Sequence, residues 1–155
     1  YVPEAMLKIA DLREQDSEYE HSQKVYATLQ SKFPFHTDAR TAAYREGRAR
    51  MWLCRRLAYN LPRCEDTRSF FKHLLARYPD LEQREEVRGW DTELANYMAE
   101  DAYQQAKSYD TKRRTVHAAI SAWEVFLKKY PDSPHAEEVR GRIEELRTRI
   151  AAPNK

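Results

Sequence analysis

Glycine is scarce in this chain of 155 residues, which has only Gly47, Gly89 and Gly141. Runs in which apolar and polar residues alternate, the pattern of a half-buried strand, are also missing. These absences argue against sheet proteins, because strands need such runs and their tight turns commonly need glycine. We therefore expect an all-α protein.

Long hydrophobic runs are absent as well. No stretch approaches the roughly 18 apolar residues of a membrane-spanning helix, and the opening YVPEAMLK does not have the organisation of a secretory signal. Because the sequence starts with tyrosine instead of methionine, we expect a processed or trimmed product, with any signal segment upstream.

Recognisable catalytic and cofactor motifs are missing too. The sequence contains no P-loop, dinucleotide-binding fingerprint or nucleophile-elbow serine, so we expect a protein that is not an enzyme and binds no cofactor. His36 stands close to Asp38, and His135 close to Glu138. Each pair offers two ligands where a structural zinc needs four, and we expect no metal site.

Cysteine occurs twice, at Cys54 and Cys64, near a predicted helix end and in the loop after it. A disulfide between them is permitted in an oxidising compartment, but it requires α-carbons within about 7 Å, which the sequence does not fix. A bridge and two unlinked thiols both stay open, with the unlinked pair favoured.

Charge of one sign is not in excess. Charged residues make up 34% of the chain, yet the net charge is only +2, so acidic and basic side chains are mixed over a solvated helical surface. This is not the basic footprint of a nucleic-acid-binding protein. A basic α-solenoid that binds nucleic acid is therefore only the third functional hypothesis.

What the sequence does contain is one template used three times. An aromatic residue is followed by proline at Phe33-Pro34, Tyr78-Pro79 and Tyr130-Pro131. Counting back from each proline, similar residue types recur: small residues twelve before (Ser22, Thr67, Ala119), aromatics eight before (Tyr26, Phe71, Trp123) and large apolar residues five before (Leu29, Leu74, Phe126). The repetition predicts three equivalent units.

The spacing of the template is that of a packed helix with a fixed end. Steps of four, three and four residues place its positions on one apolar stripe of an α-helix. Proline has no amide hydrogen and disfavours helical geometry in the residue before it, so each helix ends there. We expect an irregular α-solenoid of about three helical hairpins plus a capping helix, forming a single domain over residues 1–155.

Turn and capping signals place the individual helices. We expect a breaker-rich loop at 60–66, a cap made by Asp80 and Gln83, a loop at 107–115, and a last helix that Ser133 and Pro134 begin. The predicted helices are 3–14, 19–33, 37–59, 67–77, about 80–109, 116–129 and about 134–151.

Apolar stripes mark the first and last of these helices. An edge on the opening helix consists of Val2, Ala5, Ile9 and Leu12, and a seam on the last helix consists of Ala136, Val139, Ile143, Leu146 and Ile150. We expect the last helix to cap the array, since a terminal repeat covers the apolar face of its neighbour. A seam left for a partner helix is the alternative.

The template resembles the second helix of a tetratricopeptide repeat, most closely at Ala119, Trp123, Tyr130 and Pro131. It departs from that family in having a large apolar residue in place of the second alanine, and prolines farther apart than the roughly 34 residues of a regular array. Residues 19–151 further resemble the BamD family of outer-membrane lipoproteins, most specifically in SFFKHLLARYPDLEQ, ELANYMAEDAYQQAKSYD and AAISAWEVFLKKYPDSPHAEEVRGRI.

The BamD resemblance implies a scaffold of the β-barrel assembly machinery on the periplasmic face of the outer membrane. Such a scaffold docks a partner subunit and binds segments of unfolded barrel proteins, and a lipid anchor upstream of residue 1 is implied by the resemblance only. The alternative is a generic tetratricopeptide adaptor that binds peptides for cell-wall, division or pilus machinery.

Candidate binding residues lie on the expected first helices and in one loop. Arginines could grip ligand carboxylates, and aromatic side chains could pack against apolar groups. A solvated charged face and ordinary core packing are the simpler interpretations. The candidates are Arg45, Arg48, Trp52, Trp90, Asn96, Tyr97, Lys112, Arg113 and Arg114.

Overall fold

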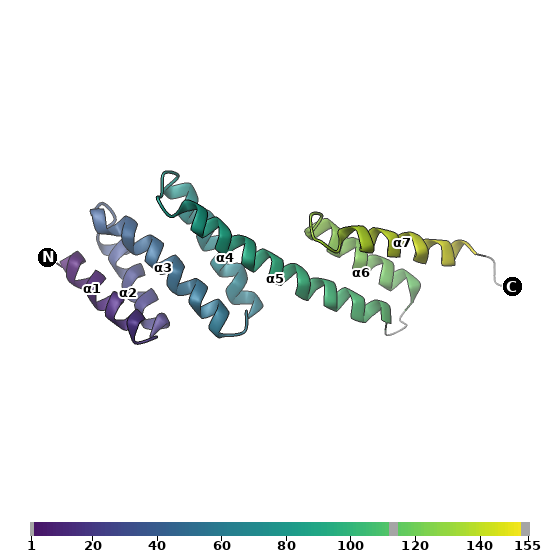
Figure 1. Cartoon of the computed structure of the whole chain (residues 1–155), viewed down its shortest axis with the longest axis horizontal. Coiled ribbons are helices and arrows are strands. Elements are labelled where there is room, and N and C mark those ends of the chain that lie inside the picture. Colours follow the sequence, from purple (N-terminus) through teal and green to yellow (C-terminus); the bar gives the residue numbers. More distant parts are fainter. Residues whose placement is uncertain (1, 112–114, 153–155) are drawn as a thin grey trace. The chain divides into compact units, whose positions relative to one another are not determined.

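The secondary structure of the chain is helical. A computed structural model describes residues 2–111 and 115–152, and no strand occurs among them. The helices are α1 (Val2–Gln15), α2 (Tyr19–Lys32), α3 (Thr37–Arg56), α4 (Leu61–Arg77), α5 (Arg84–Thr111), α6 (Val116–Lys129) and α7 (Ala136–Ala151) (Figure 1). The all-α, tetratricopeptide-like class is confirmed. None of these helices combines the length and apolar character needed to cross a membrane.

The three aromatic-proline turns share one backbone pattern. In each, the N–H of the aromatic residue donates to the carbonyl four residues earlier, and its own carbonyl accepts from the N–H three residues later. The first of these bonds measures 2.8–2.9 Å and the second 3.0–3.2 Å, at Phe33, Tyr78 and Tyr130, which end α2, α4 and α6. The repetition predicted from the template is therefore present in the backbone.

The template positions are also the buried ones. The aromatic, large apolar and small positions of the template are all buried: Tyr26, Phe71, Trp123, Leu29, Leu74, Phe126, Ser22, Thr67 and Ala119. Each of α2, α4 and α6 carries three of these residues on one stripe, and that stripe faces the neighbouring helices as the spacing predicts.

The contacts within the chain divide into two compact units, Tyr1–Leu94 and Ala95–Lys155. That residues 1–155 form a single repeat domain stays a prediction. In the first unit α1, α2 and α3 pack around a core that includes Ala10, Tyr26 and Leu29. In the second unit the C-terminal part of α5 packs with α6 and α7 around Tyr103 and Trp123. Helix α5 contributes residues to both units.

The predicted loop at 60–66 is wrong. Helix α3 ends at Arg56, because Ala58 and Tyr59 have φ values of 52° and 54°, outside right-handed helical geometry. Helix α4 then begins at Leu61, since the Asn60 side chain accepts a hydrogen bond from the Arg63 N–H at 3.3 Å. Pro62 fits in this first turn, because the N–H groups there have no partner within the helix and proline lacks that N–H.

The predicted cap of α5 is also wrong. The helix begins at Arg84, and the Asp80 carboxylate pairs with Arg40 at 3.1 Å in place of capping. At its other end α5 continues to Thr111, so residues 107–111 of the expected loop at 107–115 are helical.

Helix α7 begins at Ala136, later than predicted. The Ser133 hydroxyl accepts from the His135 N–H at 3.2 Å within a turn that precedes the helix, so Ser133 and Pro134 are not its first residues. Four of the five predicted seam residues are buried, from Ala136 to Leu146. Ile150 is exposed because the last turn of α7 extends past the core, which ends at Leu146.

Candidate protein-binding surface

A groove of about 520 Å³ opens between α5, α6 and α7 in the second unit. Its residues on α5 and on α7 recur mainly at spacings of three or four, so each helix turns one continuous face toward it. The lining consists of Tyr103, Lys107, Asp110, Thr111, Trp123, Glu138, Val139, Gly141, Arg142 and Glu145. This set is referred to below as the α5–α7 groove.

Asp110 joins the three helices of the groove. Its carboxylate accepts two hydrogen bonds from Arg142, at 2.7 and 2.8 Å, and one from the Trp123 indole N–H at 3.0 Å. The Arg142 guanidinium lowers the pKa of Asp110, with a smaller contribution from the indole and against the opposing effect of burial. The carboxylate is therefore ionised and held in place at neutral pH.

Tyr103 lies buried at one side of the groove. The His135 ring stacks on it with centroids 3.7 Å apart and planes 6° apart, and its hydroxyl donates to Glu138 at 2.7 Å. That hydrogen bond and burial raise the pKa of Tyr103 to about 12. His135 Nε2 also lies 2.6 Å from Glu100, so the His135–Glu138 pair predicted from the sequence belongs to an aromatic and ionic cluster.

Gly141 stands in the middle of α7, on its groove face. A Cβ placed there would meet no atom within 4 Å, so packing does not require a glycine. Glycine within a helix costs about 1 kcal/mol relative to alanine. Its missing side chain leaves the α7 backbone open to the groove, where the backbone of a ligand can approach closely.

One wall of the groove lies in a segment with a recognisable family pattern. Residues 102–133 match the tetratricopeptide repeat family. The match runs from Ala102 in α5 through α6 to the turn before α7, so it covers one hairpin and less than half of the chain. No curated protein matches the chain closely enough to count as a relative.

This match gives the hairpin a functional class. Tetratricopeptide repeats generally mediate protein or peptide binding and are generally not catalytic. The predicted resemblance at Ala119, Trp123, Tyr130 and Pro131 falls within the matched segment. The fold and the match therefore support a tetratricopeptide-like scaffold for protein interaction.

Two predicted binding residues, Arg45 and Arg48, contact carboxylates of the chain itself. Arg45 donates to Asp11 at 2.6 Å, and Arg48 donates to both oxygens of Glu14 at 2.8 and 3.0 Å. The Tyr26 hydroxyl donates to the same two carboxylates, and burial and these contacts raise its pKa. These side chains tie α1, α2 and α3 together, and their partner-binding role stays a prediction.

The two candidate tryptophans differ in exposure. Trp52 is 43% exposed, with its ring stacked near Tyr19 at 6.3 Å. Trp90 is half-buried between the rings of Tyr44 and Phe71, each 5.8 Å away. Trp52 is thus the more accessible ring, whereas Trp90 packs within the first unit, and a partner-binding role of either stays a prediction.

The remaining candidate residues come after Arg45, Arg48, Trp52 and Trp90 in the sequence. Asn96 is exposed and Tyr97 half-buried, both on the part of α5 that belongs to the second unit. Lys112, Arg113 and Arg114 lie outside the described residues. The predicted set is therefore divided between the two units, and no residue of it that the structure describes lines the α5–α7 groove.

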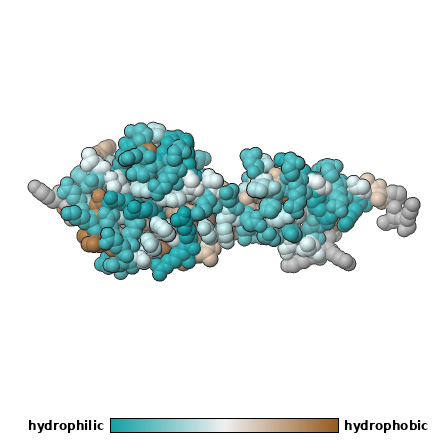
Figure 2. Space-filling model, in the orientation of Figure 1, coloured by the Kyte–Doolittle hydropathy of each residue, from teal (hydrophilic) through white to brown (hydrophobic). Residues whose placement is uncertain are grey.

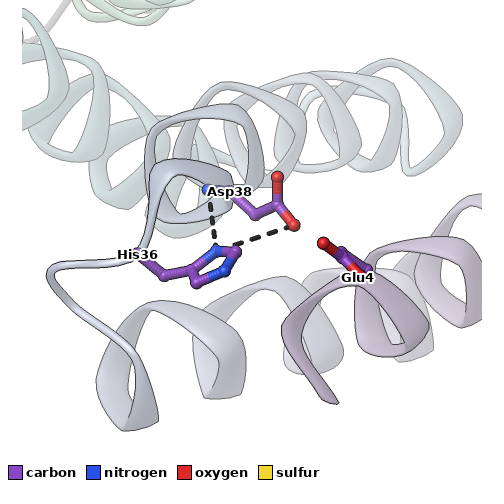
Figure 3. Close-up of side chains that lie close together, drawn as sticks. All are labelled: Glu4, His36 and Asp38. Atoms are coloured by element: carbon purple, nitrogen blue, oxygen red, sulfur yellow. Dashed lines mark hydrogen bonds and ion pairs between the residues drawn. The ribbon is translucent and has the colours of Figure 1, made fainter. Parts of the chain in front are cut away.

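Glu4, His36 and Asp38 bring their ligand atoms within 4.8 Å of one another, at the starts of α1 and α3 (Figure 3). Figure 3 shows the carboxylates of Glu4 and Asp38 pointing toward each other. The sequence suggests only the His36–Asp38 pair, because Glu4 comes from a distant segment. Asp38 Oδ2 is buried and accepts no hydrogen bond from the described residues.

This cluster is not a complete zinc site within the described residues. The Asp38 N–H donates to His36 Nδ1 at 3.1 Å, so that ring nitrogen already caps α3. A cation would have at most three of these side chains as ligands, whereas structural zinc takes four.

The two cysteines are unlinked, as favoured from the sequence, and both are buried. The Cys54 thiol donates to the Thr67 hydroxyl at 3.3 Å. Burial and the neighbouring Cys54 raise the pKa of Cys64 to about 12. A thiol with so high a pKa is a poor nucleophile at neutral pH.

Proposed function

We propose that this chain is a non-enzymatic scaffold that binds a segment of a partner protein in the α5–α7 groove. The observation that carries the proposal is the open backbone at Gly141, which lies on a charged groove beside a hairpin that matches the tetratricopeptide repeat. Gly89 has the same free space around it, and Gly141 differs from it in that it lines a groove, where the backbone of a ligand can approach closely.

The groove chemistry favours a particular kind of segment. The lining holds three carboxylates, of Asp110, Glu138 and Glu145, and two cationic side chains, of Lys107 and Arg142. Arg142 pairs with both Asp110 and Glu145, so the lining keeps an excess of one negative charge. Carboxylates bind basic side chains through charge-assisted hydrogen bonds. A segment that carries a basic residue therefore fits the two exposed glutamates of this lining.

For the identity of the partner we rely on the resemblance to the BamD family. On this proposal the chain acts at the periplasmic face of the outer membrane, docks a subunit of the β-barrel assembly machinery and binds unfolded barrel-protein segments. The three equivalent turns agree with a repeat scaffold of this kind. A generic peptide-binding adaptor would have the same groove and a different partner.

The test is affinity capture of the full-length protein from its own membranes, with two matched variants. Gly141→Trp fills the groove, whereas Gly89→Trp adds the same side chain at an exposed mid-helix glycine that also has free space around it. We expect the wild type and Gly89→Trp to recover an outer-membrane barrel protein, and Gly141→Trp to lose it.

The outcomes separate the proposals. Recovery of a different partner that Gly141→Trp abolishes would support the groove and reject the barrel-assembly role. Equal recovery by both variants would reject the groove as the binding site.

A further inference from the structure

Helix α1 has an apolar face that no described residue covers. Val2, Ile9 and Leu12 are 58%, 49% and 59% exposed, although the opposite face of the helix buries Pro3 and Ala10. With the exposed Ala5, these residues follow the spacing of a single helical stripe. Figure 2 shows hydrophobic surface in the region of the first unit where Figure 1 places α1. We refer to Val2, Ala5, Ile9 and Leu12 as the α1 stripe.

A second groove, of about 530 Å³, lies on α5 and α6 and includes no residue of α7. Its lining is mostly apolar, with small residues at Ala102, Ala106, Ala118, Ser121 and Ala122. Larger side chains stand beside them, among them Tyr109 and Val125, and Val125 is 67% exposed. This is called the alanine groove below.

The α1 stripe and the alanine groove match in shape and length. Branched side chains on a helix pack into the spaces that small residues leave on a facing pair of helices. At 1.5 Å per residue, the stripe from Val2 to Leu12 and the groove along α6 from Ala118 to Lys129 each span roughly 15 Å. One helix of the size of α1 therefore fills the groove from end to end.

Charge fixes the direction in which α1 would lie. Lys129 lines one end of the groove, and the exposed Asp16 follows Leu12 by about one turn. If α1 runs parallel to α6, then Asp16 reaches the end of the groove where Lys129 stands. The opposite direction places Asp16 at the other end, away from this lysine.

We propose that the α1 stripe of one copy of this chain docks in the alanine groove of a second copy. Each copy carries one stripe and one groove, so the contact joins different surfaces of the two copies. Unless two copies exchange α1 reciprocally, such a contact adds further copies as the concentration rises. The interaction is separate from the α5–α7 groove and does not depend on the proposed function.

The test uses two variants of the whole chain, each of which disables one surface. Leu12→Lys places a charge on the stripe, and Val125→Lys places one in the groove. Both residues are exposed in the single chain, so neither change removes core packing. Ile150→Lys, at an exposed apolar residue outside both surfaces, is the matched control. The average mass of each protein is measured by light scattering and sedimentation from about 10 μM to about 1 mM, the range of weak interfaces.

We expect the wild type and Ile150→Lys to gain mass with concentration. Leu12→Lys and Val125→Lys should each weaken association at least about tenfold, because a charge would enter an apolar contact. An equimolar mixture of these two variants should again associate, since Val125→Lys retains its stripe and Leu12→Lys retains its groove.

Three results would overturn the proposal: a wild type that stays monomeric throughout this range, single variants that associate like the wild type, or a mixture that stays monomeric. Circular dichroism of each variant shows whether its helices are intact. A misfolded variant is replaced by Ile9→Lys or by Ser121→Arg, which test the same two surfaces at other exposed positions.

Discussion

Trp123 is the residue at which the apolar core of the second unit meets its polar groove. Its ring is buried among Tyr103 and Phe126, while its indole N–H donates to Asp110 at 3.0 Å. Replacing it therefore removes both packing and a hydrogen bond.

We predict that Trp123→Ala lowers the free energy of unfolding of the second unit by about 3–5 kcal/mol. Urea denaturation followed by circular dichroism measures the change. Trp52→Ala is the control, because Trp52 is 43% exposed where Trp123 is 3% exposed, and it should cost less than about 1 kcal/mol. A Trp123→Ala cost as small as that of the control would contradict the buried position.

The thiols of Cys54 and Cys64 should be unreactive in the folded protein. Both are buried, and the raised pKa of Cys64 leaves very little of the nucleophilic thiolate at pH 8. We predict that a colorimetric disulfide reagent labels neither cysteine within minutes, and labels both once urea unfolds the chain. A variant with a cysteine at the exposed Ser69 gives the rate of an accessible thiol. Rapid labelling of the native wild type would show that the α3–α4 junction opens readily.

At the scale of the helices, Asp110 couples the contacts of α5, α6 and α7 to pH. In the unfolded chain its carboxyl titrates at the ordinary value of 3.8, and in the folded chain the Arg142 guanidinium lowers that pKa. A carboxyl with a lowered folded pKa stabilises the fold above its unfolded pKa. That contribution is lost as the pH falls below about 3.8 through the folded pKa.

We therefore predict that the second unit loses stability as the pH falls below about 3.8, with a smaller loss in Asp110→Asn, which has no carboxyl to protonate at this position. Thermal denaturation at a series of pH values measures both. At pH 7 the variant should be the less stable protein, because Arg142 loses Asp110 and keeps only Glu145 as an ionic partner. Parallel pH profiles for the two proteins would assign the acid sensitivity to other carboxylates.

The second helices were predictable because local signals decide them. A proline sets the end of each of α2, α4 and α6, and the apolar stripe that precedes it in each helix is buried. The start of α4 was not predictable in this way, because the segment NLPRCED contains residues that disfavour the interior of a helix but suit its first turn. Asn60 as a cap and Pro62 in that turn convert the expected loop into a helix.

The α5–α7 groove was missed for a different reason. Tyr103, Lys107 and Asp110 have helical spacing in the sequence, and so do Glu138 and Arg142, which is a signal that could have been used. The sequence does not show that this face of α5 packs beside this face of α7. Arg45 and Arg48 were predicted to bind carboxylates of a partner, but they contact Asp11 and Glu14 of the chain itself. The sequence does not show these contacts, because the two carboxylates lie on a helix 34 residues earlier.

At the scale of the whole molecule, the division into two compact units raises the question of cooperativity. Stacked helical repeats have stabilities that approximate the sum of local terms and contacts between neighbours. Leu29 is buried in the first unit and Phe126 in the second. Each provides a way to destabilise one unit through its own core.

We predict that Phe126→Ala increases amide hydrogen exchange in α6 and α7 by about a hundredfold or more, which corresponds to about 3 kcal/mol. Exchange in α1, α2 and α3 should change by less than about threefold. Leu29→Ala should give the reverse pattern, with faster exchange in α1, α2 and α3 and little change in α6 and α7. Hydrogen exchange with mass spectrometry resolves these segments. Uniform acceleration across all helices in either variant would mean that the two units unfold as one, because opening of one core would then expose the amides of both.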